Sequence, residues 1–252
     1  MGALHGGHMA LIEDARRRSD LVVVSIFVNP LQFNRHDDFD KYPRPIDEDV
    51  DACRAAGVAA VYAPTAAVMY PDGFQTHVEP GPLADSLEGS SRPGHFRGVA
   101  TVVAKLFGAI QPDVAVFGQK DFQQLAIIRR MVTDLDMGIE IVGAPTVRES
   151  DGLAISSRNS RLSADDRQAV VCIVQALHLA SAAFEAGERD TARLVGLATE
   201  RIVAEPRAKL DYLEVVDPVT LDPLFFIDGP ATIVAAASFG DVRLIDNLTL
   251  PA

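Results

Sequence analysis

The chain has 252 residues, which is enough for one large domain or for two smaller ones with separate hydrophobic cores. Hydrophobic residues make up 48% of it and charged residues 23%, which excludes a disordered or fibrous protein. The formal net charge of -12 argues against general nucleic-acid binding, because such binding depends on a basic surface.

Two cysteines, Cys53 and Cys172, lie far apart in the sequence, each within a predicted helix. We expect two buried thiols in a reducing compartment rather than a disulfide or a metal site. No apolar stretch approaches the roughly 18 residues of a membrane-spanning helix, and no signal peptide is visible. A cytoplasmic protein is therefore expected.

The first motif with chemical potential lies at the start of the chain, where His5 and His8 flank two glycines. An amphipathic helical pattern over residues 9–16 follows, so the histidines fall at a helix N-terminus, where N–H groups and the helix dipole favour a phosphate. This H-x-G-H pattern is typical of adenylyltransferases and class I synthetases, although ordinary helix-start residues are an alternative. Such loops follow a strand and none precedes Met1, so we expect the first strand of the sheet to be missing from this chain.

Strands and helices then alternate over about 145 residues. The β-branched run at 21–28 predicts a strand covered on both faces. Helices are predicted at about 46–56, 98–110 and 122–135, and further strands at 58–63, 114–117 and 139–142. This alternation predicts the α/β class, with a doubly wound parallel sheet. Together with the H-x-G-H pattern, it indicates a Rossmann-like sheet of the class I synthetase or nucleotidyltransferase type.

After Val147 the alternation ends. Helical patterns at 164–186 and 191–204 precede short strands at 211–216, 232–237 and 243–246. Helices followed by strands predict a smaller α+β domain. We therefore expect two domains, residues 1–146 and 147–252, with the loop around Ser156 near the boundary.

Three polar segments, 29–33, 118–121 and 156–159, follow predicted strands, so we expect them to converge at the carboxyl edge of the sheet. Lys120 offers an ammonium group for phosphates, or is simply a solvated loop lysine. The segment at 156–158 consists of Ser156, Ser157 and Arg158 and resembles the phosphate loop of class I synthetases. Its two hydroxyl groups and its guanidinium suit a triphosphate.

Other polar residues leave two interpretations open. Gln32 and Gln124 suit a small carboxylate or hydroxyl substrate, but each alone is more typical of a surface amide. The acidic run at 47–49 favours a helix dipole, while Glu48 and Asp49 are also candidate Mg²⁺ ligands. A serine hydrolase, a zinc enzyme and a dehydrogenase are disfavoured, because G-x-S-x-G, zinc-ligand spacing and a dinucleotide fingerprint are absent.

Taken together, six segments resemble the pantothenate synthetase (pantoate–β-alanine ligase) family over Met1 to about Asn247. They are M-G-A-L-H-x-G-H at 1–8, S-I-F-V-N-P-x-Q-F at 25–33, Y-P-R at 42–44, R-P-x-H-F-x-G-V at 92–99, F-G-x-K-D-x-Q-Q at 117–124 and S-S-R-N at 156–159. Their common order makes the resemblance specific, although no single motif carries it.

The resemblance implies that ATP adenylates pantoate, with loss of pyrophosphate, and that β-alanine then attacks the adenylate to give pantothenate and AMP. It implies catalytic roles for His8, as proton donor, His5 and Lys120. It implies ATP contacts for Met1, Gly2, His5, Gly7, His8, Gly118, Lys120, Asp121, Val147 (through its backbone), Ser156, Ser157 and Arg158. Substrate contacts are implied for Gln32, Gln124, Asn29, Arg92 and His95, with Mg²⁺ at the phosphates. The first domain would then bind ATP and pantoate, the second would act as a lid, and the enzyme would be a homodimer.

Three positions depart from the family pattern. Gly6 replaces a usual Glu, and no loss of function is expected there. Gln119 also replaces a usual Glu and keeps hydrogen bonding but loses a charge beside Lys120, while Ile155 replaces a usual Met and keeps an apolar wall of similar volume. Two competing hypotheses stay open at this point. One is a nucleotidyltransferase that stops at an adenylylated product, and the other is a non-catalytic scaffold.

Overall fold

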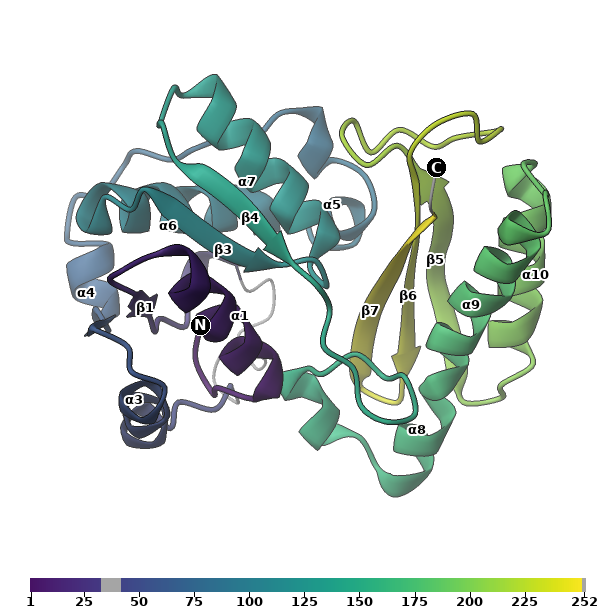
Figure 1. Ribbon diagram of the computed structural model, residues 1–252, viewed down its shortest axis with the longest axis horizontal. Helices are drawn as coiled ribbons and strands as arrows, with labels where there is room; N and C mark the ends of the chain where they lie inside the picture. Colours follow the sequence, from purple (N-terminus) through teal and green to yellow (C-terminus); the bar gives the residue numbers. More distant parts are fainter. Residues whose placement is uncertain (33–41, 251–252) are drawn as a thin grey trace. The chain divides into compact units, whose positions relative to one another are not determined.

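The computed structural model describes residues 1–32 and 42–250, so Phe33 of the predicted substrate segment lies outside the described residues. The chain divides into two compact units. The first unit comprises Met1–Gln119 and Gln123–Pro145, and the second comprises Lys120–Phe122 and Thr146–Ala252. Figure 1 shows their helices and strands.

The first unit alternates helices with short parallel strands. Its elements are α1 (Gly6–Arg18), β1 (Val23–Ser25), η1 (Pro30–Gln32), α3 (Ile46–Ala55), β2 (Ala60–Tyr62), α4 (Ala66–Met69), η2 (Pro82–Ala84), α5 (Glu88–Ser91), α6 (His95–Ile110), β3 (Val114–Gly118), α7 (Phe122–Asp134) and β4 (Glu140–Ala144). Strand β1 pairs in parallel with β2, and β3 pairs in parallel with β4. The α/β class with parallel strands is therefore confirmed.

The prediction of one continuous sheet is wrong for the described residues, because they form two separate parallel pairs. The predicted strand at 21–28 is also too long: β1 spans three residues, and Leu21 and Val23 are 77% and 40% exposed. One edge of β1 is bonded to β2, and the start of the chain bonds to the end of β1 and the residues after it. There the Met1 amino group donates to the Ser25 carbonyl, and the Phe27 N–H donates to the Met1 carbonyl.

Two hydrophobic clusters hold the first unit together. Helices α6 and α7 contribute most of the larger cluster, which includes Phe96, Val99, Ile127 and Ile128, and the partly buried strand residue Phe117 packs against it. The smaller cluster joins α1, β1 and α3 through Ile12, Val24 and Cys53, among others. Burial of these apolar surfaces fixes the helices that carry the N-terminal histidines and the R-P-x-H-F segment.

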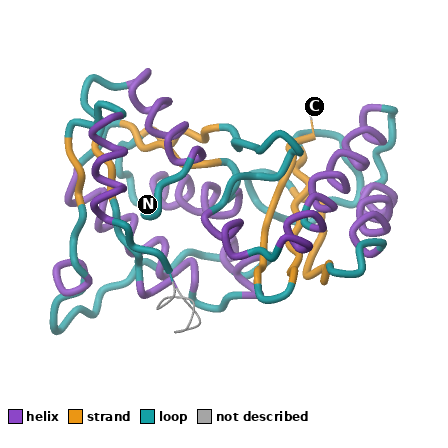
Figure 2. The backbone as a smooth tube through the Cα atoms, turned by 90° about the horizontal axis from the view of Figure 1, so that it is seen from below, coloured by secondary structure: helices purple, strands orange, loops and turns teal. Residues whose placement is uncertain are grey.

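The second unit is an antiparallel sheet with helices on one face. Its elements are η3 (Ser157–Arg161), α8 (Ala164–Ala169), α9 (Val171–Glu185), α10 (Thr191–Val203), β5 (Ala208–Val216), β6 (Ala231–Phe239) and β7 (Val242–Leu250), with strand order β5-β6-β7. Figures 1 and 2 agree that α9 and α10 lie along the same side of these strands. The predicted helix at 164–186 is in fact two helices that meet at Val170, and each of the three strands is longer than predicted.

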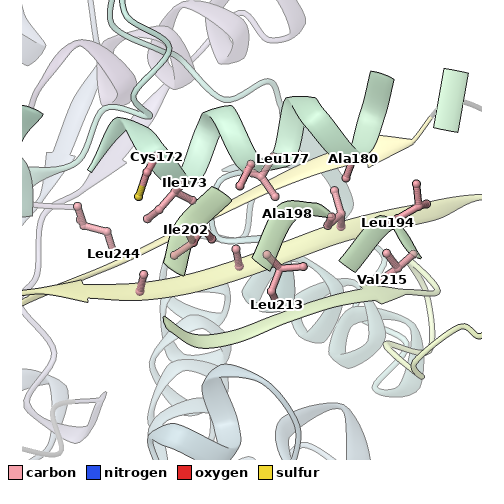
Figure 3. Packing of buried hydrophobic residues seen from close by; sticks show 14 of the residues in the cluster. Cys172, Ile173, Leu177, Ala180, Leu194, Ala198, Ile202, Leu213, Val215 and Leu244 are labelled. Carbon is pink, nitrogen blue, oxygen red and sulfur yellow. The ribbon is translucent and has the colours of Figure 1, made fainter. Parts of the chain in front are cut away.

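The core of the second unit lies between the helix pair and the sheet. Figure 3 shows Ile173 and Leu177 of α9 and Ile202 of α10 beside residues of the strands. Cys172 belongs to this core, and both cysteines of the chain are buried free thiols, as predicted.

One stretch, Ala164–Glu185, meets the length and composition criteria for a membrane-spanning helix, so the expectation that none would do so is wrong. Half of its apolar window is buried within the structure. The buried side chains include Cys172, Ile173 and Leu177, which pack in the second core, so core packing accounts for the hydropathy of this stretch.

Candidate active site

The two N-terminal histidines lie at the start of α1, as the sequence predicted. His5 is the N-cap residue, and its Nδ1 accepts a hydrogen bond of 3.2 Å from the Gly7 N–H. His8 lies in the first turn, and the two rings stack with centroids 4.0 Å apart. Because Nδ1 of His5 is an acceptor, a neutral His5 carries its proton on Nε2, which is then a hydrogen-bond donor.

A buried carboxylate holds the loop that precedes these histidines. The two oxygens of Asp49 accept the Ala3 and Leu4 N–H groups at 2.8 and 2.6 Å, and Asp49 is 3% exposed. Ala3 has a positive φ of 50°, so this loop needs such support. Sequence reasoning missed this task, because the partners lie 45 and 46 positions apart.

Helix α1 packs against β3, whose carboxyl end is Gly118. A Cβ atom on Gly118 would meet the Leu11 side chain of α1 at 3.9 Å, which is ordinary van der Waals contact. The first unit therefore brings the N-terminal histidine helix against the strand that leads to Lys120.

A network of buried amides organises the predicted substrate segment. The Asn29 Nδ2 donates to Gln32 Oε1 at 3.2 Å and to the Gly98 carbonyl at 3.1 Å. Its Oδ1 accepts from the Tyr70 hydroxyl at 2.7 Å and from the Leu31 N–H at 3.2 Å. Asn29 is 1% exposed and uses its full hydrogen-bonding capacity within the protein, so it positions Gln32. Burial raises the pKa of Tyr70 to about 12.

Arg92 and His95 lie against the same turn. Arg92 donates to the Gln32 carbonyl at 3.1 Å, and His95 Nδ1 lies 2.8 Å from that carbonyl. A carbonyl only accepts, so Nδ1 of His95 carries a proton, while Nε2 lies 3.3 Å from Arg92 Nη1. The structure thus joins Gln32 with two residues that are 60 and 63 positions away.

The two glutamines at the start of α7 have different environments. Gln124 is partly buried in the first turn. Gln123 is 5% exposed, accepts the Glu88 N–H, and donates to the carbonyls of Leu83 and Ser86. Gln123 therefore anchors the segment before Arg92. The sequence motif contains Gln123, but its role was not predicted.

Lys120 belongs to the second unit, although the residues on either side of its short segment belong to the first. Its carbonyl accepts a hydrogen bond of 3.0 Å from the Asn247 side chain, and its Nζ lies 4.0 Å from Asp121 Oδ1. The Lys120 side chain is 17% exposed, and that of Asp121 is 52% exposed. Of the three loops that were expected to converge, residues 29–32 belong to the first unit, residues 118–121 are divided between the two units, and residues 156–159 belong to the second unit. Their convergence stays a prediction.

The Ser156 loop starts the short helix η3. The Ser156 hydroxyl accepts the Arg158 N–H at 3.3 Å and caps this helix, while the Ser157 carbonyl accepts the Ser160 hydroxyl. The Val147 carbonyl accepts the Ile155 N–H at 3.0 Å in the hairpin that precedes the loop. The loop therefore has a defined conformation that rests on this hairpin.

The two candidate magnesium ligands, Glu48 and Asp49, have different environments. Glu48 is exposed in the first turn of α3, and both oxygens of Asp49 are bonded to backbone N–H groups. Within residues 1–32 and 42–250, no group of three His, Cys, Asp or Glu side chains is placed to hold a metal ion.

The family model for pantoate-beta-alanine ligase matches residues 1–249. The chain belongs to the pantoate–β-alanine ligase family. It is 51% identical to the pantothenate synthetase of Syntrophotalea carbinolica, over 98% of this chain and 87% of that protein. It is 52% identical to pantothenate synthetase 1 of Bradyrhizobium diazoefficiens, over 99% and 88% of the two chains.

Solved structures of this ligase family share the fold. The pantothenate synthetase of Thermus thermophilus superimposes with a TM-score of 0.97 at 47% identity, covering 100% of this chain and 91% of that one. A Francisella tularensis pantoate-beta-alanine ligase, complexed with beta-gamma ATP and β-alanine, gives a TM-score of 0.80 at 35% identity. The match covers 98% of this chain and 86% of that one. The chain is accordingly an enzyme of pantothenate biosynthesis, a ligase that joins pantoate to β-alanine.

Proposed function

We propose that this ligase runs through an acyl adenylate. A carboxylate oxygen of (R)-pantoate attacks the α-phosphorus of ATP, the bond to the bridging oxygen breaks, and pyrophosphate leaves. The amine of β-alanine then attacks the carbonyl carbon, the bond to AMP breaks, and the amine loses a proton. Both steps build negative charge on phosphate oxygens, so donors that are already in position lower the barriers.

The observation that carries this proposal is the cap of α1. His5 and His8 stand together at a helix N-terminus, where N–H groups and the dipole favour a phosphate. The Nδ1 contact to Gly7 leaves the His5 proton on Nε2 as a donor. We assign the ATP phosphates to both rings, with His8 as proton donor to the leaving pyrophosphate and with backbone contacts from Met1, Gly2 and Gly7.

The remaining nucleotide contacts come from two groups of residues. In the first unit, Gly118 lets the nucleotide approach the end of β3. In the second unit, ammonium, guanidinium, hydroxyl and backbone groups are assigned to the nucleotide: Lys120, Asp121, Val147, Ser156, Ser157 and Arg158. Mg²⁺ enters this proposal only as the ion that accompanies ATP, where it would neutralise phosphate charge. We further propose that residues 1–146 form the ATP- and pantoate-binding part, in which the Lys120–Phe122 segment groups with the second unit, and that residues 147–252 form an α+β lid.

Pantoate is assigned to Gln32 and Gln124, and Gln32 also serves β-alanine. The Gln32 side-chain oxygen is held by Asn29, so its amide nitrogen is oriented as a donor. Arg92 and His95 fix the backbone of the same residue. We therefore propose that Asn29, Arg92 and His95 act on the substrate by holding Gln32 in position.

Isotope exchange tests the adenylate pathway. Exchange of labelled pyrophosphate into ATP should require pantoate but not β-alanine, whereas AMP release should require both substrates. Exchange that needs β-alanine would exclude the adenylate, and exchange without any β-alanine-dependent release of AMP would favour a nucleotidyltransferase. Absence of all turnover would favour the scaffold hypothesis.

The histidine assignment has a matched control. His8→Ala should lower the exchange rate by about 10²–10³-fold, the usual loss for a donor to a developing anion. His178→Ala removes an exposed imidazole on α9 of the second unit and should leave the rate unchanged. We also propose that the enzyme is cytoplasmic and forms a homodimer. Sedimentation of the purified enzyme tests the dimer.

A further inference from the structure

Strand β7, far along the chain from Lys120, holds the segment that carries this lysine. The Asn247 Nδ2 donates to the Lys120 carbonyl at 3.0 Å across 127 positions of sequence. Asn247 is 8% exposed, so water competes little for this bond. The contact agrees with the division of the chain, in which Lys120–Phe122 groups with the second unit although its neighbours do not.

Asn247 is itself held on both sides of its backbone. The Asp246 carboxylate accepts the Asn247 N–H at 2.8 Å, and Arg148 Nη2 donates to the Asn247 carbonyl at 3.3 Å. Arg148 also makes a bidentate pair with Asp246, at 2.6 and 2.9 Å. The Asp246 side chain is 5% exposed, and a buried two-point pair of this kind has one favoured geometry.

The same arginine reaches the hairpin that leads to Ser156. Arg148 donates to the Gly152 carbonyl at 3.0 Å and pairs with Ala154 across the hairpin. One cluster, made of Arg148, Asp246 and Asn247, therefore touches both nucleotide segments that are assigned to the second unit. It fixes the Lys120 segment relative to the Ser156 hairpin.

We infer that Asn247 is a positioning residue for Lys120, and that Arg148 and Asp246 hold Asn247 in place. The inference rests on the proposed role of Lys120 at the ATP phosphates. Loss of the Asn247 donor would keep the ammonium group of Lys120 but release the backbone that positions it. The loss should therefore lower kcat/KM for ATP, and only when Lys120 is present.

A double-mutant cycle tests this dependence. Asn247→Ala should lower kcat/KM for ATP by about tenfold, and Lys120→Met by more. Asn247→Asp, which keeps the shape but removes the amide donor, should match Asn247→Ala and serves if the alanine variant folds poorly. In the Lys120→Met background, Asn247→Ala should cause no further loss, because the residue acts through the lysine.

Thr249→Ala is the matched control, since Thr249 is an exposed residue two positions along the same strand. Its kcat/KM should equal that of the parent enzyme. Independent, multiplying losses from Asn247→Ala and Lys120→Met would overturn the inference, as would wild-type kcat/KM in Asn247→Ala and Asn247→Asp. Wild-type activity in Lys120→Met would instead remove the proposed role of the lysine, and the inference with it.

Discussion

Substitution of Gly98 by alanine tests how the substrate turn is positioned. A Cβ atom at Gly98 would lie 2.3 Å from the Leu31 carbonyl oxygen, 2.6 Å from its carbon and 2.9 Å from the Gln32 nitrogen. All three are backbone atoms, so no side-chain rotation relieves the overlap. Non-bonded carbon contacts need about 3.5 Å, so the turn must move by about 1 Å.

That displacement falls on Gln32, whose carbonyl and side chain are held by Arg92, His95 and Asn29. A shift of about 1 Å in a substrate-positioning group costs about 10²-fold in rate. We therefore expect Gly98→Ala to lower kcat/KM for pantoate by about 10²-fold, and stability by about 1–3 kcal/mol from overpacking. The measurement is steady-state AMP release with pantoate varied, together with thermal unfolding.

Gly108 provides the matched control on the same helix. Apart from its chain neighbours and the backbone of its own helix, no atom of the described residues lies within 4 Å of a Cβ atom there. Gly108→Ala should keep kcat/KM for pantoate and raise stability by about 0.5–1 kcal/mol, because alanine is the better helix former. If Gly98→Ala retained wild-type kcat/KM for pantoate in the folded enzyme, the proposed positioning of Gln32 by this turn would be refuted.

Three further substitutions or reagents probe separate parts of the structure. Asp49→Asn places an NH₂ group against the N–H of Ala3 or Leu4, so urea unfolding should show a loss of about 1–3 kcal/mol, with a higher KM for ATP; unchanged values would contradict the loop assignment. The pKa of Tyr70 is about 12 in the folded state, above the usual value of about 10, so the unfolded phenol ionises first and stability should fall as pH rises from 10 to 12. Tyr70→Phe should reduce that fall, and an identical pH profile would argue against it. Burial raises the pKa of Cys172 to about 11, so iodoacetamide at pH 8 should label this thiol only as the protein unfolds, and rapid labelling of the native enzyme would contradict its burial.

Local features of the fold were predictable from the sequence because they depend on near neighbours. The cap at His5 follows from two glycines beside an amphipathic helix, and the structure places α1 there. The strand–helix alternation likewise gave the positions of α6, α7, β3 and β4 to within a few residues. The short β1 was not predictable, since apolar β-branched residues do not reveal which edge of a strand will find a partner.

The role of the acidic run shows where sequence reasoning ends. Asp47, Glu48 and Asp49 all stand in the first turn of α3, where each would favour the helix dipole. Only Asp49 is buried, and its two oxygens reach the backbone of Ala3 and Leu4. Sequence spacing cannot distinguish the three, because the distinction arises from tertiary contact.

The family motifs contain residues that use all their hydrogen bonds within the protein and residues that keep a donor for a ligand. Asn29 has two amide hydrogens and two acceptor sites, and the protein uses all of them, so a ligand would have to displace an existing bond. The Gln32 side chain is bonded through its oxygen to Asn29, and its amide nitrogen makes no hydrogen bond within the described residues. A polar ligand gains most binding free energy from donors that are already oriented but not yet hydrogen-bonded. A donor that is already bonded would first have to break its buried hydrogen bond, and that loss must be compensated. Substitutions at Asn29 should thus act through stability and Gln32 geometry, whereas substitutions at Gln32, the proposed pantoate residue, should change substrate binding directly.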